Sequence, residues 1–318
     1  MELTPEIIDR IQKLKEKYDA MGQDLVSYLD GLLYSEYLTY WDYIHLDTLL
    51  SLQNPRTDFP DEKIFIMYHQ VTELYFKMIL SECEQICNHT DINEKFFIER
   101  MIRINRYFEH LTSSFDIMVD GMDREQFLKY RMALLPASGF QSGQYRMIEI
   151  YATDFINLVD KDVREEFKKE KFDANKFLEN IYWKHGATEL STGKKTLTLR
   201  QFEDKYLETF SKLASARHEN NIYSVYKKLN SSNPTAKEVM RRFDTNVNVN
   251  WPLVHYKSAV RYLHKDPADI KATGGTNWQK YLPPRFQKRI FYPELWTNDE
   301  IENWGKAWVE QTLKDLNK

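Results

Sequence analysis

Glycine and proline are scarce in this chain, with 10 of each among 318 residues. So few turn-forming residues favour long helices over a turn-rich β fold. The two cysteines, Cys83 and Cys87, lie four residues apart, and one such pair predicts free thiols in a reducing cytoplasm rather than a disulfide framework. The N-terminal stretch MELTPEIIDRIQKLKEKY has no apolar signal-peptide core, and no run of about 20 uncharged apolar residues predicts a membrane span.

An excess of basic residues is also missing. Lys plus Arg number 44 and Asp plus Glu number 48, so the formal net charge is −4 and gives no electrostatic footprint for nucleic acid. Aromatic residues are abundant instead, at 14% of the chain with 20 Tyr, 18 Phe and 7 Trp. Aromatic side chains bring large buried areas and flat walls suited to flat ligands.

Helical periodicity dominates the chain and predicts an all-α fold. We expect helices at about 5–18, 38–53, 60 to beyond 87, 94–119, 124–135, 138–156, 207–230, 251–264 and 298–316. A capping box of Ser138 and Gln141 is expected to start the sixth of these. The one alternating, strand-like pattern is TNVNVNW at Thr245–Trp251. The chain is interpreted as one domain, 1–318, in which the Lys- and Glu-rich segment Lys161–Tyr206 is a solvated, partly helical excursion.

The common catalytic strings HExxH, CxxC, GxGxxG and the P-loop do not occur, so candidate chemistry depends on helical spacing. His69, in IFIMYHQVTELYFK, falls on the border between an apolar and a wet helix face, with Phe65 one turn before it. Two roles are open for it. It is either a core histidine bonded to Glu73 or to backbone, or a pocket histidine that bonds a ligand.

Two further clusters stand out. In WPLVHYKSAVRYL, Trp251, His255 and the small residues Ser258 or Ala259 share one stripe. This leaves room for a flat macrocycle beside the imidazole, as a proximal haem ligand requires, although a buried structural histidine would give the same pattern. Phe127 and Arg131 also share a face, and such a pair can hold a carboxylate bidentately while the ring packs on the ligand. A surface arginine beside a core phenylalanine is the alternative.

Several motifs then occur in a fixed order: YWDYIHLDTLLSLQ, FIMYHQVTELYFKMIL, FLKYRMALLPASGFQSGQYRMIE, WPLVHY, TGG and FYPELW. In this combination the chain resembles the tryptophan 2,3-dioxygenase family. The resemblance covers the main helical segments of Leu38–Ile150 and Trp251–Trp296. The HQxxEL and SGFQSxQYR strings are its most specific parts.

The resemblance implies an all-α helical bundle that encloses a haem pocket, and a role for each matching position. His255 corresponds to the proximal histidine that binds the iron of haem b. His69 corresponds to the distal histidine that faces the indole N–H of the substrate, and Arg131 to the arginine that pairs with its carboxylate. The other positions that match substrate-binding residues are Tyr40, Tyr43, Ile44, Phe65, Phe127, Leu134, Ser138, Gly139 and Thr273.

The implied activity is insertion of O2 across the indole C2–C3 bond of L-tryptophan to give N-formylkynurenine, in tryptophan catabolism by the kynurenine pathway. The family pattern also implies a homotetramer, in which the helix with Tyr40 and Tyr43 closes the pocket of a neighbouring subunit. Neither a nucleic acid nor a membrane is expected as a partner.

Two departures keep alternatives open. Ala272 stands where the family usually has glycine before the threonine, and the stretch from His255 to Thr273 is a few residues longer than usual. A haem-dependent relative that oxidises a different indole carboxylate is therefore an alternative. A non-catalytic helical haem protein is another, although a diatomic ligand would need no carboxylate clamp at Arg131. A helical interaction module without haem is the third.

Overall fold

The computed structural model describes residues 3–35, 38–131, 141–185, 187, 194–263, 284 and 288–306. Helix makes up 74% of the structure, and these residues contain no β-strand, only an isolated bridge between Val159 and Ile181. The all-α prediction is confirmed. The chain divides into two compact units, Met1–Asn54 and Pro55–Lys318, which are described separately here.

The first unit consists of short helices with little core of its own. Its helices are α1 (Pro5–Ala20), α2 (Leu25–Leu33), α3 (Tyr40–Tyr43) and α4 (Leu46–Leu50). Thr4 caps α1 by accepting from the Ile7 amide, and Pro5 occupies the first helical position, as the sequence predicts. Apolar side chains are widely exposed on this unit, with Tyr40 72% and Tyr43 73% accessible.

The single helix predicted over 38–53 is interrupted. His45 adopts a left-handed conformation with φ of 52°, and it separates α3 from α4. A residue with positive φ cannot continue a right-handed helix, and histidine tolerates this conformation better than β-branched residues do. The apolar spacing on either side continues across the break, so periodicity alone does not reveal it.

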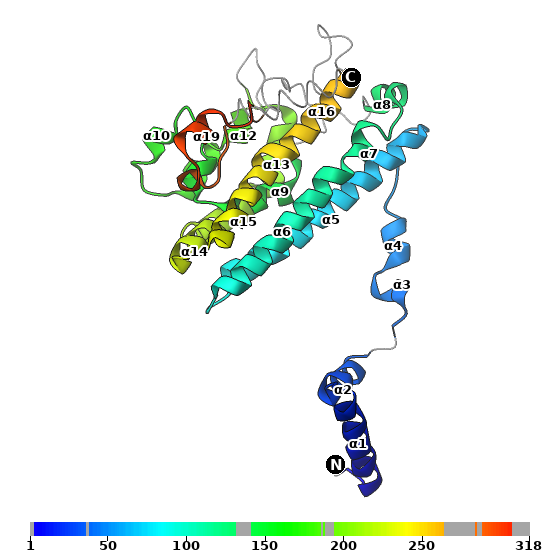
Figure 1. Ribbon diagram of the computed structural model, residues 1–318. Helices are drawn as coiled ribbons and strands as arrows, with labels where there is room; N and C mark the ends of the chain where they lie inside the picture. Colours follow the sequence, from blue (N-terminus) through cyan, green and yellow to red (C-terminus); the bar gives the residue numbers. More distant parts are fainter. Residues whose placement is uncertain are drawn as a thin grey trace. The chain divides into compact units, whose positions relative to one another are not determined.

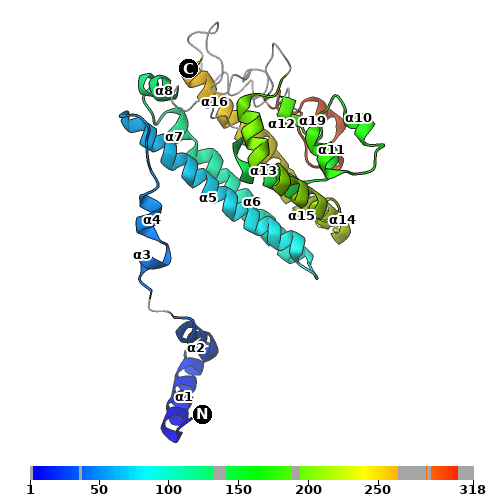
Figure 2. The same cartoon turned by 180° about the vertical axis from the view of Figure 1, so that it is seen from behind.

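The second unit is built around two long helices. α5 (Pro60–Asn88) and α6 (Glu94–Ser114) run side by side in opposite directions, and α15 (Pro234–Thr245) packs along α6 (Figures 1 and 2). The remaining elements are α7 (Asp116–Val119), α8 (Arg124–Tyr130), α9 (Gly143–Ala152), η3 (Phe155–Leu158), α10 (Arg164–Phe167), α11 (Ala174–Glu179), α12 (Tyr182–His185), α13 (Leu197–Arg217), α14 (Ile222–Leu229), η4 (Asn246–Asn250), α16 (Trp251–Leu263), η5 (Pro293–Leu295) and α19 (Asn298–Glu302).

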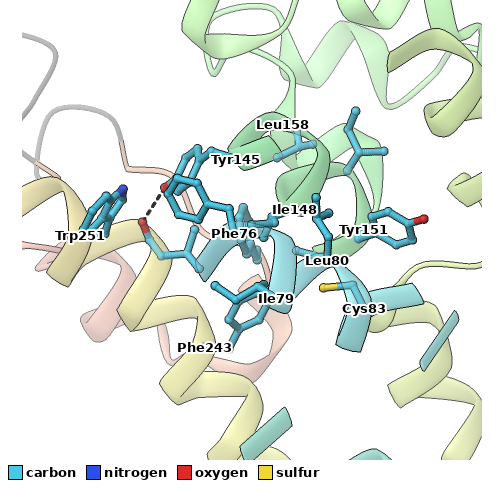
Figure 3. Packing of buried hydrophobic residues seen from close by; sticks show 14 of the residues in the cluster. Phe76, Ile79, Leu80, Cys83, Tyr145, Ile148, Tyr151, Leu158, Phe243 and Trp251 are labelled. Carbon is cyan, nitrogen blue, oxygen red and sulfur yellow. Dashed lines mark hydrogen bonds between the residues drawn. The ribbon is translucent and has the colours of Figure 1, made fainter. Parts of the chain in front are cut away.

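The core lies where α5, α6, α9 and α15 face one another. Phe76 of α5 contacts Tyr145 of α9 and Trp251 at the start of α16, and Ile79 and Ile148 belong to the same buried cluster (Figure 3). Cys83 and Cys87 belong to the same cluster, at 0% and 4% exposure, and both are free thiols as predicted. Among the described residues, no helix is long and apolar enough to cross a membrane.

The segment Lys161–Tyr206 is less solvated than its charge suggests. Its aromatic and aliphatic side chains turn inward, and the buried ones include Phe167, Phe177, Leu178, Ile181, Trp183, Leu199 and Phe202. α11 packs on α13, and α13 packs on α9, so part of this segment is continuous with the main core. Some of its charges form ion pairs at the surface, such as Lys168 with Glu165, whereas the buried Lys184 bonds Glu203 at 2.6 Å.

Two local predictions change in the structure. Ser138 lies outside the described residues, and α9 begins later than expected, with Ser142 as N-cap accepting from the Tyr145 amide at 3.2 Å. The alternating segment TNVNVNW is not a strand. Asn246–Asn250 forms the π-helical turn η4, which continues α15 directly into α16. A helical turn that is buried on all sides loses the polar and apolar faces by which helices are recognised.

Candidate functional site

α5 presents Phe65 and His69 on one face, one turn apart. Their rings lie 4.0 Å apart between centroids. His69 Nδ1 lies 2.7 Å from the Phe65 carbonyl oxygen, which can only accept a hydrogen bond. The Nδ1 atom therefore carries the proton, and in the neutral ring Nε2 is left as an acceptor.

His69 is both accessible and partly desolvated, as expected of a residue that binds a small ligand. The side chain is accessible, yet desolvation by the surrounding protein lowers the pKa of His69, against opposing contributions from the Phe65 carbonyl and Glu73. Glu73 itself does not bond the imidazole. It accepts from the Gln144 amide of α9 at 2.8 Å. Of the two partners considered from the sequence, backbone rather than Glu73 satisfies Nδ1.

His255 on α16 has the same arrangement. Its Nδ1 donates to the Trp251 carbonyl at 2.9 Å, so Nε2 is the atom left with a lone pair. The ring is half-buried and lies 4.4 Å from both the Phe115 and the Trp251 ring centroids. Burial lowers the pKa of His255 to about 4, and the imidazole is neutral at neutral pH.

The two histidines belong to one site. A positive charge on His69 is close enough to lower the pKa of His255 further. Two aromatic rings connect them, because Tyr68 lies 6.3 Å from His69 and 5.7 Å from Phe115, which in turn contacts His255. Aromatic side chains therefore form a continuous set of contacts between the two histidines.

The end of α8 adds the third part of the site. Arg131 follows α8 directly, and its backbone N–H donates to the carbonyl of Phe127, so the two residues share a turn as predicted. Phe127 packs on Tyr262 of α16 with centroids 4.6 Å apart, and Tyr130 packs on Phe65 of α5 at 6.0 Å. Arg131 is 6% exposed, and this burial lowers its pKa.

The structure therefore brings together Phe65, His69, Phe127 and His255, on α5, α8 and α16, and places Arg131 at the end of α8 next to Tyr130. Tyr40, Tyr43 and Ile44 belong to the separate first unit. Leu134, Ser138, Gly139 and Thr273 lie outside the described residues.

Two residues of the site escaped the sequence reasoning. Phe115 forms the break between α6 and α7, where periodicity predicts an uninterrupted helix to Val119, and its ring turns toward His255. Tyr130 lies between Phe65 and Phe127 and is fully buried. Its position next to Arg131 was the available signal, since ligand sites combine aromatic side chains with a small number of polar or charged groups.

Comparison with known proteins decides the family. The family model for tryptophan 2,3-dioxygenase matches residues 31–258, a range that includes His69, Arg131 and His255. The chain belongs to the tryptophan 2,3-dioxygenase family. Its members are oxidoreductases, so the resemblance predicted from the motifs is confirmed at this level.

Individual tryptophan 2,3-dioxygenases show how the similarity is distributed. One from Ruegeria sp. (strain TM1040) is 38% identical over 117 residues, which cover 36% of this chain and 42% of that protein. One from Herpetosiphon aurantiacus is 42% identical over 118 residues, 36% of this chain and 45% of that protein. These matches span less than half of each relative. One from Bacillus anthracis is 28% identical over 270 residues, 83% of this chain and 92% of that protein.

Proposed function

We propose that the protein is a haem-dependent dioxygenase that converts L-tryptophan and O2 to N-formylkynurenine. The observation that carries the proposal is the pair His69 and His255. Each has its Nδ1–H committed to its own helix, and each therefore offers Nε2 within one aromatic-walled site. Membership of the tryptophan 2,3-dioxygenase family supports the same function.

The residues fit haem b with His255 as the proximal ligand. A metal-ligating histidine typically donates its other ring N–H to a carbonyl or carboxylate, which fixes the ring and raises its basicity, and the Trp251 carbonyl does this for His255. In the part of the chain that the structure describes, no group of three or more His, Cys, Asp or Glu side chains converges as a metal site. A haem iron needs no such group, because the porphyrin supplies its equatorial ligands.

The bound haem supplies the oxygen chemistry, and the protein supplies binding and orientation. The indole N–H donates a hydrogen bond to Nε2 of His69, a role that needs a neutral imidazole and not a strong base. Phe65 lies beside it and gives the indole an aromatic surface. Arg131 pairs with the carboxylate of the amino acid, and a bound anion offsets the cost of burying its guanidinium.

We further propose that the working protein is a homo-oligomer, a tetramer by analogy with the family. The first unit supports this, because Tyr40 and Tyr43 leave about three quarters of their surface accessible and large exposed apolar surfaces mark interaction sites. In such an assembly the helix α3 would complete the tryptophan site of a neighbouring copy.

The test is anaerobic reduction of the haem-reconstituted protein, followed by addition of tryptophan and O2. The expected result is a Soret band on reconstitution and the N-formylkynurenine chromophore on turnover. Replacement His255→Ala is expected to abolish both histidine binding to the iron and product. Product from another indole carboxylate, with none from tryptophan, would select the relative with a different substrate. The absence of a Soret band would overturn the haem assignment itself.

A further inference from the structure

A buried polar network surrounds η4, the π-helical turn that leads into α16. Asn246 donates its Nδ2–H to Asn105 of α6 at 3.0 Å, and Asn250 donates to Asn246 at 2.9 Å. Asn248 points the other way and donates to Asp244 at 2.7 Å. The alternating asparagines therefore bond η4 to α6 on one side and to Asp244 on the other, in a turn that has almost no contact with water.

Arg289 lies on the side of η4 to which Asn248 points. Its Nε donates to Asn248 Oδ1 and its Nη2 to the Val247 carbonyl at 3.3 Å, so it holds η4 at two successive residues. It also bonds α9: Nη1 donates to Glu149 at 2.7 Å and Nη2 to the Tyr145 hydroxyl at 3.0 Å. Arg289 is 5% exposed. A guanidinium is stable in such a position only when its donors are satisfied, so these contacts form a specific clamp.

The π form of η4 determines how α16 is presented. A π turn holds one residue more than an α turn, and it is rare because its geometry is less favourable. Relaxation of η4 to regular α-helix would change the register of every following residue by one position. On a helix that is a rotation of about 100°, enough to turn His255 to a different face.

One residue joins this turn to the candidate iron ligand. The Trp251 N–H donates to the Asn246 carbonyl, a bond across five residues that closes the π turn. The Trp251 carbonyl accepts from His255 Nδ1 at 2.9 Å. The backbone of Trp251 therefore closes η4 with its N–H and orients the His255 imidazole with its carbonyl. Trp251 itself forms T-shaped contacts with the Phe76 and Phe115 rings, at 5.9 and 5.3 Å between centroids.

We propose that Arg289 is a positioning residue for His255. It holds η4 in its π form through Asn248 and the Val247 carbonyl, and this sets the direction in which His255 presents Nε2. The inference rests on the proposed function in one respect, namely that Nε2 of His255 binds haem iron. The new element is that a residue of the segment Arg289–Trp296, which is separate from α16 in the sequence, supports the orientation of His255.

The test compares two variants with a matched control. Arg289→Lys keeps a positive charge but cannot reach Asn248, Glu149 and Tyr145 together. Asn248→Ala removes one of the two contacts of Arg289 with η4 and leaves the Val247 contact and the Arg289–Glu149 ion pair, so it remains informative if Arg289→Lys folds poorly. Thr153→Val is the control, because Thr153 bonds the Phe291 carbonyl at 2.5 Å in the same C-terminal segment without touching η4.

The first readout is haem binding and the iron–histidine stretching band of the ferrous protein in resonance Raman spectra. Supporting residues of metal ligands typically change metal affinity by 10- to 100-fold, so both variants are expected to bind haem about 10-fold or more weakly, with a shifted or broadened band. Thr153→Val is expected to keep the wild-type band. An unchanged band and affinity in both variants would overturn the role of Arg289.

The second readout does not involve haem. In the haem-free protein, hydrogen exchange of the Trp251 amide is expected to be faster in both variants than in Thr153→Val, because this amide closes the π turn. Equal exchange in all three would overturn the clamp on η4. If the wild-type protein shows no iron–histidine band while the exchange difference is present, the haem assignment fails and the clamp stands.

Discussion

Gly143, at the first position of α9, is packed too closely for any side chain. A Cβ atom built there would lie 2.6 Å from a ring carbon of Tyr206 on α13. The Tyr206 ring has little freedom to withdraw, because it stacks on Phe210 at 5.7 Å and contacts Phe202 at 5.0 Å. Replacement Gly143→Ala therefore perturbs the junction between the charged segment and the helix that carries Gln144 and Glu149.

The expected size of the effect follows from two opposing contributions. Forcing a methyl group into a filled space typically costs about 1–3 kcal/mol. Alanine in place of glycine in a helix returns about 0.5–1 kcal/mol. We expect Gly143→Ala to lower the free energy of unfolding by roughly 1 kcal/mol in total. In a Tyr206→Ala background the clash is gone, and the same substitution is expected to stabilise by about 0.5 kcal/mol.

A double-mutant cycle in urea measures this directly, with helix content and tryptophan fluorescence as probes. The coupling between the two positions is expected to be about 1–3 kcal/mol. Additive effects, within about 0.3 kcal/mol, would show that Gly143 and Tyr206 do not touch and would refute the packing of α13 on α9.

Three further outcomes are expected. Arg131→Lys loses the bidentate pair with a carboxylate, worth about 1.5–3 kcal/mol, and should raise KM for tryptophan roughly 10- to 100-fold in steady-state kinetics; an equal effect on tryptamine, which has no carboxylate, would contradict this role. His69→Ala should weaken binding of tryptophan roughly 2- to 10-fold and leave 1-methyltryptophan, which lacks the indole N–H, unaffected; identical losses for both ligands would argue against the hydrogen bond. Burial raises the pKa of Asp244 from 3.8 to about 6 despite four N–H donors, so between these values the folded state holds a proton that the unfolded state has lost. The contribution of Asp244 to stability therefore falls as pH rises, and the difference in unfolding free energy between wild type and Asp244→Asn, measured in urea, should fall by about 1.4 kcal/mol from pH 5 to pH 7; a difference independent of pH would contradict the shift.

Sequence patterns predict the regular helices well where local signals are strong. Pro60 and the apolar spacing after it predict the start of α5, which begins at that residue. The pairing of Phe127 with Arg131 and the stripe that carries His255 follow from helical spacing alone. Each of these features depends on contacts within one or two helical turns, and such contacts can be predicted from the sequence without knowledge of the fold.

Long-range contacts determine what the sequence could not show. The π form of η4 depends on Asn105 and Arg289, which lie far away in the chain, and its alternation looks like a strand. The aromatic residues of the segment Lys161–Tyr206 are buried by one another, by Phe155 of η3 and by the packing of α13 on α9. The nearness of His69 to His255 likewise results from packing of α5, α7 and α16 and not from spacing within any one helix.

The buried thiols of α5 have a practical consequence. Burial raises the pKa of Cys87 to about 12 and that of Cys83 well above its usual value, and only the thiolate reacts with alkylating reagents and oxidants. Both thiols are therefore expected to be unreactive as long as α5 remains packed. His69, the candidate distal histidine, lies on the same helix. The rate at which an alkylating reagent labels Cys83 and Cys87 therefore measures how often α5 unpacks from the core.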